Sequence, residues 1–330
     1  MNAASAGGSV PHPIDPPTLN TMLQLEVHRV PVLALLAALM CVLYLAGAIR
    51  LWRTGARWSV LRTLSFVGGS ALLTVTTGTE IDAYGTVLFS AFMFQQLTLM
   101  IAVPPLLVWG SPGRLLLEAT PKRGWGRRLR GVVSGSLRSR WARLVVHPGV
   151  TIPLFLVAYY GLYFTGIVDA ALSLSGGHTA LEALFLVAGV LFHIPVLSDG
   201  PLGGRHGHAG RLLDVFVELA LHAFFGVIVM MSSRVLIDAF ATPPQSWGID
   251  PLADQGLAGG LAWGYGEGPT LLILLVILHR WFRDDTRLAV AVDARIDRDG
   301  DPELDAYNDY LAHLNTPTRR DPAEWNREQL

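Results

Sequence analysis

Seven long apolar stretches constrain this chain more than any other feature of its sequence. They lie near residues 31–51, 61–79, 86–109, 149–172, 179–198, 212–236 and 257–281. A helix needs roughly 20 apolar residues to cross a hydrocarbon core of about 30 Å. The stretches lack the period-two alternation of a membrane barrel, and a backbone in lipid must satisfy its own hydrogen bonds. The sequence therefore predicts an all-α, polytopic membrane protein built as a bundle of seven transmembrane helices.

Composition supports a membrane protein and excludes several other classes. Hydrophobic residues make up 51% of the 330 residues and charged residues only 15%, which is atypical of a soluble domain. The formal net charge of −1 gives no general basic field, so we expect no nucleic-acid partner. Cys41 is the single cysteine and can form no intrachain disulfide. The first thirty residues lack the pattern of a cleavable signal peptide, so we expect the first helix to direct insertion.

Lysine and arginine predict the orientation of the bundle, because they gather in alternate connections. Four arginines lie between the first two helices, and nine basic residues lie between Arg114 and Arg143. More follow the fifth and seventh helices, whereas Arg29 and Arg234 alone fall on the opposite side. That side carries Glu80, Asp82, Asp238, Asp250 and Asp254. The positive-inside rule then places the N-terminus outside the cell and the C-terminus in the cytoplasm.

These assignments divide the chain into three parts. We expect an extracytoplasmic arm at 1–30, a transmembrane domain at 31–282 and a cytoplasmic tail at 283–330. The transmembrane domain includes a basic cytoplasmic loop at 111–148. Within it, the segment 121–146 either lies on anionic lipid or is a solvated loop whose charge sets the topology.

Local signals refine the predicted elements. The tail has short helical patterns around Ala289–Arg295 and Glu303–Leu314. Pro104 and Pro105 predict a kink or an end near the close of the third apolar stretch, because neither residue can donate a backbone hydrogen bond.

Few ionisable or amide side chains fall inside the predicted helices, and each is a candidate for function because burial in lipid is costly. His178 and Glu182, like Glu218 and His222, are spaced i, i+4 and so share a helix face. Counting about 1.5 Å per residue places Gln96, His222 and Glu267 near the midplane. We therefore predict an intramembrane polar cluster. Its members are Gln96, Glu182, Glu218 and Glu267.

A glycine repeat marks the seventh apolar stretch. Gly256, Gly260, Gly264 and Gly268 form one smooth stripe at which another helix is expected to pack closely. Glu267 would then face the interior of the bundle. The alternative is a purely structural stripe, with a protonated Glu267 bonded to a neighbour.

Copper chemistry is a further interpretation of these helices. Cu(I) prefers thioether, thiolate and imidazole ligands, and Met93, His178, Met230 and Met231 fall in the outer half of the bundle by residue count. Methionine in an apolar helix is much more often core filler than a ligand. The methionines alone therefore do not decide between copper binding and core packing.

Several short motifs recur in a characteristic order along the chain. They are Leu43–Trp58, Pro104–Pro112, His147-Pro148, Gly189–Pro195, His222–Gly226, Asp254–Pro269, Arg280–Asp293 and Ala306–Leu314. Together they resemble the CtaG-type cytochrome c oxidase assembly factors, over about residues 30 to 315 and most closely in their actinobacterial form. The resemblance implies a multi-pass protein of the bacterial plasma membrane that provides copper to the oxidase. Its partners would be oxidase subunits and membrane lipid.

One motif departs from the family. Members typically carry His-Met-x-x-His on the third helix, whereas this chain has Phe92, Met93 and Gln96 at the corresponding positions. Glu182 stands where many relatives have a second histidine. A family-type copper site would therefore survive only in part, through Met93, His178 and His222.

Three functions follow from these observations. The first is oxidase assembly through a copper-related step, and the second is a metal-free scaffold for assembly, which the missing histidines favour. The third is a transporter of a small solute, a proton or a metal along Glu182, Glu218, His222 and Glu267, although no inverted repeat supports it. We expect no enzyme, because the chain lacks a phosphate-binding glycine loop, a zinc-protease motif and a serine elbow.

Overall fold

The computed structural model describes residues 15–25, 30–198 and 207–315, and almost all of its elements are helical. Most of the predicted N-terminal arm and the end of the predicted tail lie outside these residues. The chain forms two compact units, one reaching to Ile277 and the other beginning at Leu278. Among the described residues, Leu25 and Thr79 form an isolated antiparallel β-bridge.

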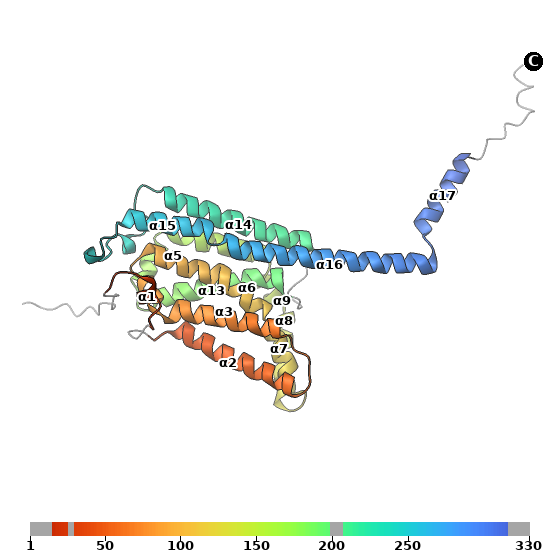
Figure 1. Cartoon of the computed structure of the whole chain (residues 1–330), viewed down its shortest axis with the longest axis horizontal. Helices are drawn as coiled ribbons and strands as arrows, with labels where there is room; N and C mark the ends of the chain where they lie inside the picture. The colour runs from red at the N-terminus through yellow and green to blue at the C-terminus, as the bar shows by residue number, and fades with distance from the viewer. Residues whose placement is uncertain (1–14, 26–29, 199–206, 316–330) are drawn as a thin grey trace, which may run out of the picture. The chain divides into compact units, whose positions relative to one another are not determined.

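Within the described residues, six helices are long and apolar enough to cross a membrane. The single-segment ones are α2 (Val32–Arg53), α3 (Val60–Gly78), α13 (Gly177–Leu197) and α14 (His208–Met231). The third span is a run from Phe89 to Ala119 and the last a run from Pro251 to Asp299. These helices confirm the all-α, polytopic membrane class, and α2 and α3 lie side by side (Figure 1).

The fourth predicted span is shorter than the others. It consists of α10 (Pro148–Leu156), the π-helix η2 (Val157–Gly161) and α11 (Leu162–Phe164). At about 1.5 Å per residue this run reaches roughly 26 Å, close to the lower limit for a membrane span. Gly166, with φ of 74°, then turns the chain into α12 (Ile167–Leu172). The count of seven, and the orientation that depends on it, stay predictions.

The prolines of the third span neither end its helix nor interrupt it. That span consists of α5 (Phe89–Leu97), the π-helix η1 (Thr98–Ala102), α6 (Val103–Trp109) and α7 (Pro112–Ala119). Pro104 and Pro105 follow the π-helix directly and occupy the first turn of α6. Because η1 runs directly into α6, neither proline is at a free helix start, and each leaves a carbonyl group of the preceding turn without an N–H donor. The chain therefore stays helical at the prolines and changes from π-helix to α-helix just before them.

The last span packs through different glycines from those the repeat predicted. Gly256, Gly260, Gly264 and Gly268 each have open space where a side chain would stand. Instead, α15 (Pro251–Gly264) packs against α14 at Gly226 and Gly259. A Cβ on Gly226 would lie 2.5 Å from Trp263 N, and a Cβ on Gly259 would lie 2.7 Å from Gly226 O. The prediction that another helix packs on the glycine stripe is wrong. The face of α15 that turns toward α14 is the one that carries Gly259.

Polar caps join the elements at the end of the bundle that carries α1 (Leu19–Met22) and α4 (Glu80–Tyr84). Asp254 accepts hydrogen bonds from the backbone N–H groups of Phe89, at 2.7 Å, and Ser90, at 3.3 Å. Asp169 accepts one from Ala239 N at 2.9 Å, at the short helix η3 (Asp238–Phe240). A second 3₁₀ turn, η4 (Gln245–Trp247), contributes Trp247 to a small cluster around Tyr84.

The basic segment and the tail are helical as well. Residues of the basic segment form α8 (Trp125–Arg138) and α9 (Arg140–Val145), and both tryptophans of the segment are exposed. The pattern at Ala289–Arg295 lies within the single helix α16 (Glu267–Asp299) instead of forming a separate element. The pattern at Glu303–Leu314 forms α17 (Pro302–Asn315).

Replacing Gly259 by alanine should destabilise the protein, because the new methyl group would overlap Met230 N on α14. Overpacking of this kind typically costs about 1–3 kcal/mol. Gly260→Ala is the matched control, one residue along α15 and with nothing within 4 Å. Thermal unfolding in detergent should show a melting temperature several degrees lower for Gly259→Ala alone; equal melting temperatures would contradict this helix contact.

Candidate functional site

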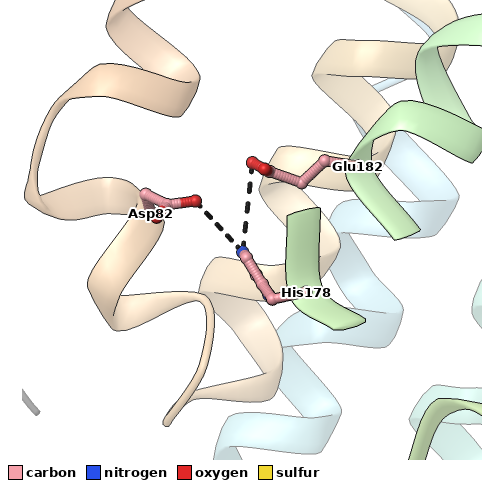
Figure 2. Close-up of side chains that lie close together, drawn as sticks. All are labelled: Asp82, His178 and Glu182. Carbon is pink, nitrogen blue, oxygen red and sulfur yellow. Dashed lines mark ion pairs between the residues drawn. The ribbon is translucent and has the colours of Figure 1, made fainter. Parts of the chain in front are cut away.

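His178 lies between two carboxylates at the α4 end of the bundle. Its Nε2 atom is 3.2 Å from Asp82 Oδ1 and 3.9 Å from Glu182 Oε1. Asp82 belongs to α4, while His178 and Glu182 lie one turn apart on α13, and both carboxylates point toward the imidazole (Figure 2). All three residues are at most 8% exposed. We call these three residues the His178 cluster.

The amide of Gln95 joins the two carboxylates. Its Nε2 donates to Glu182 Oε1 at 3.2 Å and approaches Asp82 Oδ1 at 3.4 Å and Thr76 O at 3.3 Å. Gln95 is itself buried on α5. The imidazole and the amide therefore lie against the same pair of acidic groups, where donors are needed because burial disfavours unpaired charge.

Glycines let the backbone come close enough to form this arrangement. Gly176, with φ of 79°, precedes α13, and a Cβ on Gly177 would overlap the carbonyl of Ala171. A side chain on Gly85 would overlap Gln95 Oε1 and lie 3.3 Å from His178 Cε1. These tight turns bring His178 to the first turn of α13 and Asp82 beside it.

The His178 cluster has the composition of a metal site for a divalent cation. One ligand atom from each of its three residues lies within 4.8 Å of the other two. Carboxylate oxygen and imidazole nitrogen suit cations such as Cu(II) or Zn(II), whereas Cu(I) favours sulfur and imidazole. The same three side chains also contact one another directly, as in a polar network that holds no metal ion.

A second polar pair lies on α14. His222 Nδ1 is 3.4 Å from Glu218 Oε1, and the hydroxyl of Thr270 is 3.5 Å from Glu218 Oε2. Both members of the pair are buried. His222 packs against the join between α15 and α16, where a Cβ on Gly266 would lie 2.5 Å from its Nε2.

The predicted polar cluster does not form as one group. Glu182 belongs to the His178 cluster and Glu218 to the pair on α14. Gln96 donates to Ala158 O at 3.2 Å and accepts a hydrogen bond from Tyr163 OH. Glu267 is exposed, because its neighbour Gly266 is the residue that faces His222. Of the three residues that the residue count places near the midplane, Gln96 and His222 are buried and Glu267 is not.

The predicted copper ligands are likewise divided. His178 and His222 fall in different polar groups, and Met93 is fully buried in the main apolar core. The sequence places Gln95 in the third apolar stretch and Asp82 beside the second, but it predicts no contact of either residue with the group around His178. Asp82 had a weak signal as an acid directly after a predicted helix, but nothing in the sequence placed it beside His178.

Aromatic rings connect the two polar groups. Phe92 contacts the His178 ring, with centroids 5.8 Å apart, and contacts Tyr163 in turn. Phe225 then contacts both Tyr163 and Tyr159, and the Tyr159 ring lies 6.4 Å from His222. A series of rings, with only the tyrosine hydroxyls as polar groups, thus runs from one group to the other.

These features define a polytopic, all-α membrane protein with a buried histidine and two carboxylates near one end of its bundle. Residues 42–284 match the family described as cytochrome c oxidase caa3 assembly factor (Caa3_CtaG). The chain belongs to this family, as its sequence motifs predicted.

Mycobacterial proteins are similar over most of the chain. The uncharacterized protein Mb0105 of Mycobacterium bovis and MT0111 of Mycobacterium tuberculosis are each 35% identical over 280 residues, and ML1998 of Mycobacterium leprae is 30% identical. The alignments cover 84% of this chain but 42% of each relative, so the chain spans less than half their length. No solved structure matches it.

A double-mutant cycle measures whether Asp82 and His178 are coupled. Breaking a buried ion pair by removing one partner typically costs about 3–5 kcal/mol, because the other charge is left unpaired. Asp82→Asn and His178→Ala should each lower the melting temperature, and the double variant should lower it by clearly less than their sum. Additive shifts would show that the two side chains do not interact.

Proposed function

We propose that this protein acts in maturation of the copper centre of cytochrome c oxidase, by holding copper transiently at the His178 cluster. Family membership supports a role in oxidase assembly. The observation that carries the copper step is the convergence of three metal-type ligand atoms within 4.8 Å. The copper is cargo in this account, and the protein is not an enzyme.

The ligands favour copper in its oxidised form. Two carboxylates and one imidazole give the nitrogen and oxygen donors that Cu(II) accepts. The soft set expected from the sequence, with Met93, His178 and His222, has no counterpart in the described residues as one group. We therefore expect binding to be stronger for Cu(II) than for Cu(I).

The family positions on α5 explain why the ligand set differs. Phe92 stands where family members carry a histidine and packs on the His178 ring, on Phe185 at 5.9 Å and on Phe240 at 5.5 Å between centroids. Gln96, at the other histidine position, is bonded to Ala158 and Tyr163. Because Phe92 and Gln96 occupy both of these positions, the ligands that would join His178 at a metal ion are the carboxylates of Asp82 and Glu182.

The location and partners follow from the same proposal. The protein would work in the bacterial plasma membrane, among membrane lipid and in contact with oxidase subunits. The predicted orientation places the His178 cluster on the extracytoplasmic side. The transport path along Glu182, Glu218, His222 and Glu267 gains no support, because Glu267 is exposed and aromatic rings link the two polar groups.

A metal-free scaffold for oxidase assembly is the second candidate. The observation in its favour is that Gln95 and His178 already surround the two carboxylates. In this candidate, the contacts among these four side chains stabilise the bundle without a metal ion. The two candidates differ in one measurable property, which is whether the purified protein binds copper.

Copper binding should be measured by titrating the purified, full-length protein in detergent with Cu(II), and separately with Cu(I) under reducing conditions. We expect about one tightly bound Cu(II) and much weaker binding of Cu(I). His178→Ala and the double change Asp82→Asn, Glu182→Gln should each abolish tight binding, because they remove ligand atoms.

His222→Ala is the control, since His222 lies in the separate pair on α14. It should retain Cu(II) binding at the level of the native protein. No tight copper in the native protein would reject the copper step and favour the metal-free scaffold. Loss of binding in His222→Ala but not in His178→Ala would place the metal elsewhere.

A further inference from the structure

An apolar cavity of about 610 Å³ lies between α2, α3 and α13, away from the His178 cluster. Its walls are largely aliphatic, with Leu33, Leu36 and Ala37 from α2 and Leu186 and Val190 from α13. Leu36 and Met40 in its lining are about half exposed on the bundle surface. The volume is in the range of ligand pockets, which are about 300–1,000 Å³.

One end of this cavity is basic and rich in hydrogen-bond donors. Arg62, Ser111, Gly113 and Arg114 line it there, at the start of α7. Arg62 donates to Ser111 Oγ at 2.5 Å, and this bond holds its guanidinium at this end of the cavity. Arg114 pairs with Glu118 at 2.7 Å in an exposed contact, which is weak and easily exchanged.

The start of α7 strengthens the attraction for an anion. Ser111 is held in the left-handed region, with φ of 52°, and its side chain does not cap the helix. The first backbone N–H groups of a helix lack intrahelical partners and carry partial positive charge. Gly113 and Arg114 supply such groups beside the cavity, so they add donors to the two arginines.

The deeper wall holds one more polar group. Ser70 lines the cavity, is 3% exposed, and its hydroxyl has no hydrogen-bond partner among the described residues. It lies on the same face of α3 as Arg62 and Phe66, all three of which line the cavity. A buried hydroxyl in this condition favours an occupant that brings an acceptor oxygen.

We propose that this cavity binds an anionic phospholipid. The phosphate would lie against Arg62, Arg114 and the start of α7, and an acyl chain would lie along the leucine-lined wall toward Leu33. Basic pockets between membrane helices recognise anionic head groups in this manner, and Ser70 offers a donor to the ester oxygens. The predicted orientation places the basic end in the cytoplasmic leaflet, so the lipid would bind from that side. This inference does not depend on copper.

The test uses native mass spectrometry of the delipidated, full-length protein with added phosphatidylglycerol, phosphatidylcholine or inorganic phosphate. We expect one phosphatidylglycerol to bind at least about ten-fold more tightly than phosphatidylcholine. The double change Arg62→Gln, Arg114→Gln should remove this preference. Arg127→Gln, Arg138→Gln is the matched control, because these arginines of α8 do not line the cavity.

Filling the apolar part tests the acyl-chain contact. Val190→Phe should weaken phosphatidylglycerol binding with the arginines intact, and Ala37→Leu provides a second, smaller change if the first variant is unstable. Equal binding of phosphatidylcholine would overturn the anionic site. Binding of inorganic phosphate with no effect of either cavity-filling change would mean a simple anion site and would also overturn the proposal. Copper titration of the arginine variant should be unchanged, which separates this result from the proposed function.

Discussion

The cost of placing a charged group in an apolar surrounding governs this structure. Each buried acid on the described membrane helices has a donor within reach. Glu182 has Gln95 and His178, Glu218 has His222 and Thr270, and Asp254 has the backbone N–H groups of Phe89 and Ser90. Arg114, by contrast, lies exposed at the surface of the bundle. The location of the polar groups is therefore set by pairing, and the place where an imidazole meets two carboxylates is the candidate site.

Close helix contacts make that pairing geometrically feasible. Gly85 and Gly177 remove side chains where α4 and α12 approach α13, and Gly226 and Gly259 do the same between α14 and α15. In a membrane such contacts are stabilised by packing, since lipid is as apolar as the side chains it replaces. The aromatic rings around Phe92 and Phe225 then fill the space between the two polar groups, which keeps each pair separate.

The sequence predicts the helices well and their arrangement poorly. Apolar length places the first, second and fifth predicted spans within about two residues of the observed helix ends. The i, i+4 spacing correctly pairs His178 with Glu182 and Glu218 with His222. The prediction fails for the glycine stripe and for Glu267, because both faces of a membrane helix are apolar and periodicity does not show which one turns inward. Asp82 reaches His178, and Gln95 reaches Glu182, through tertiary contacts between separate helices, which the local sequence does not encode.

The central claim, that the His178 cluster serves oxidase maturation, is tested most directly by the copper content of the oxidase in cells. In the host cell, the gene for this protein would be deleted and replaced by the native sequence, by His178→Ala or by Gly260→Ala. The amount of each protein in the membrane would be verified to be equal. The account predicts copper-deficient oxidase with His178→Ala and normal copper with the native sequence and Gly260→Ala. Normal oxidase copper with His178→Ala would contradict it.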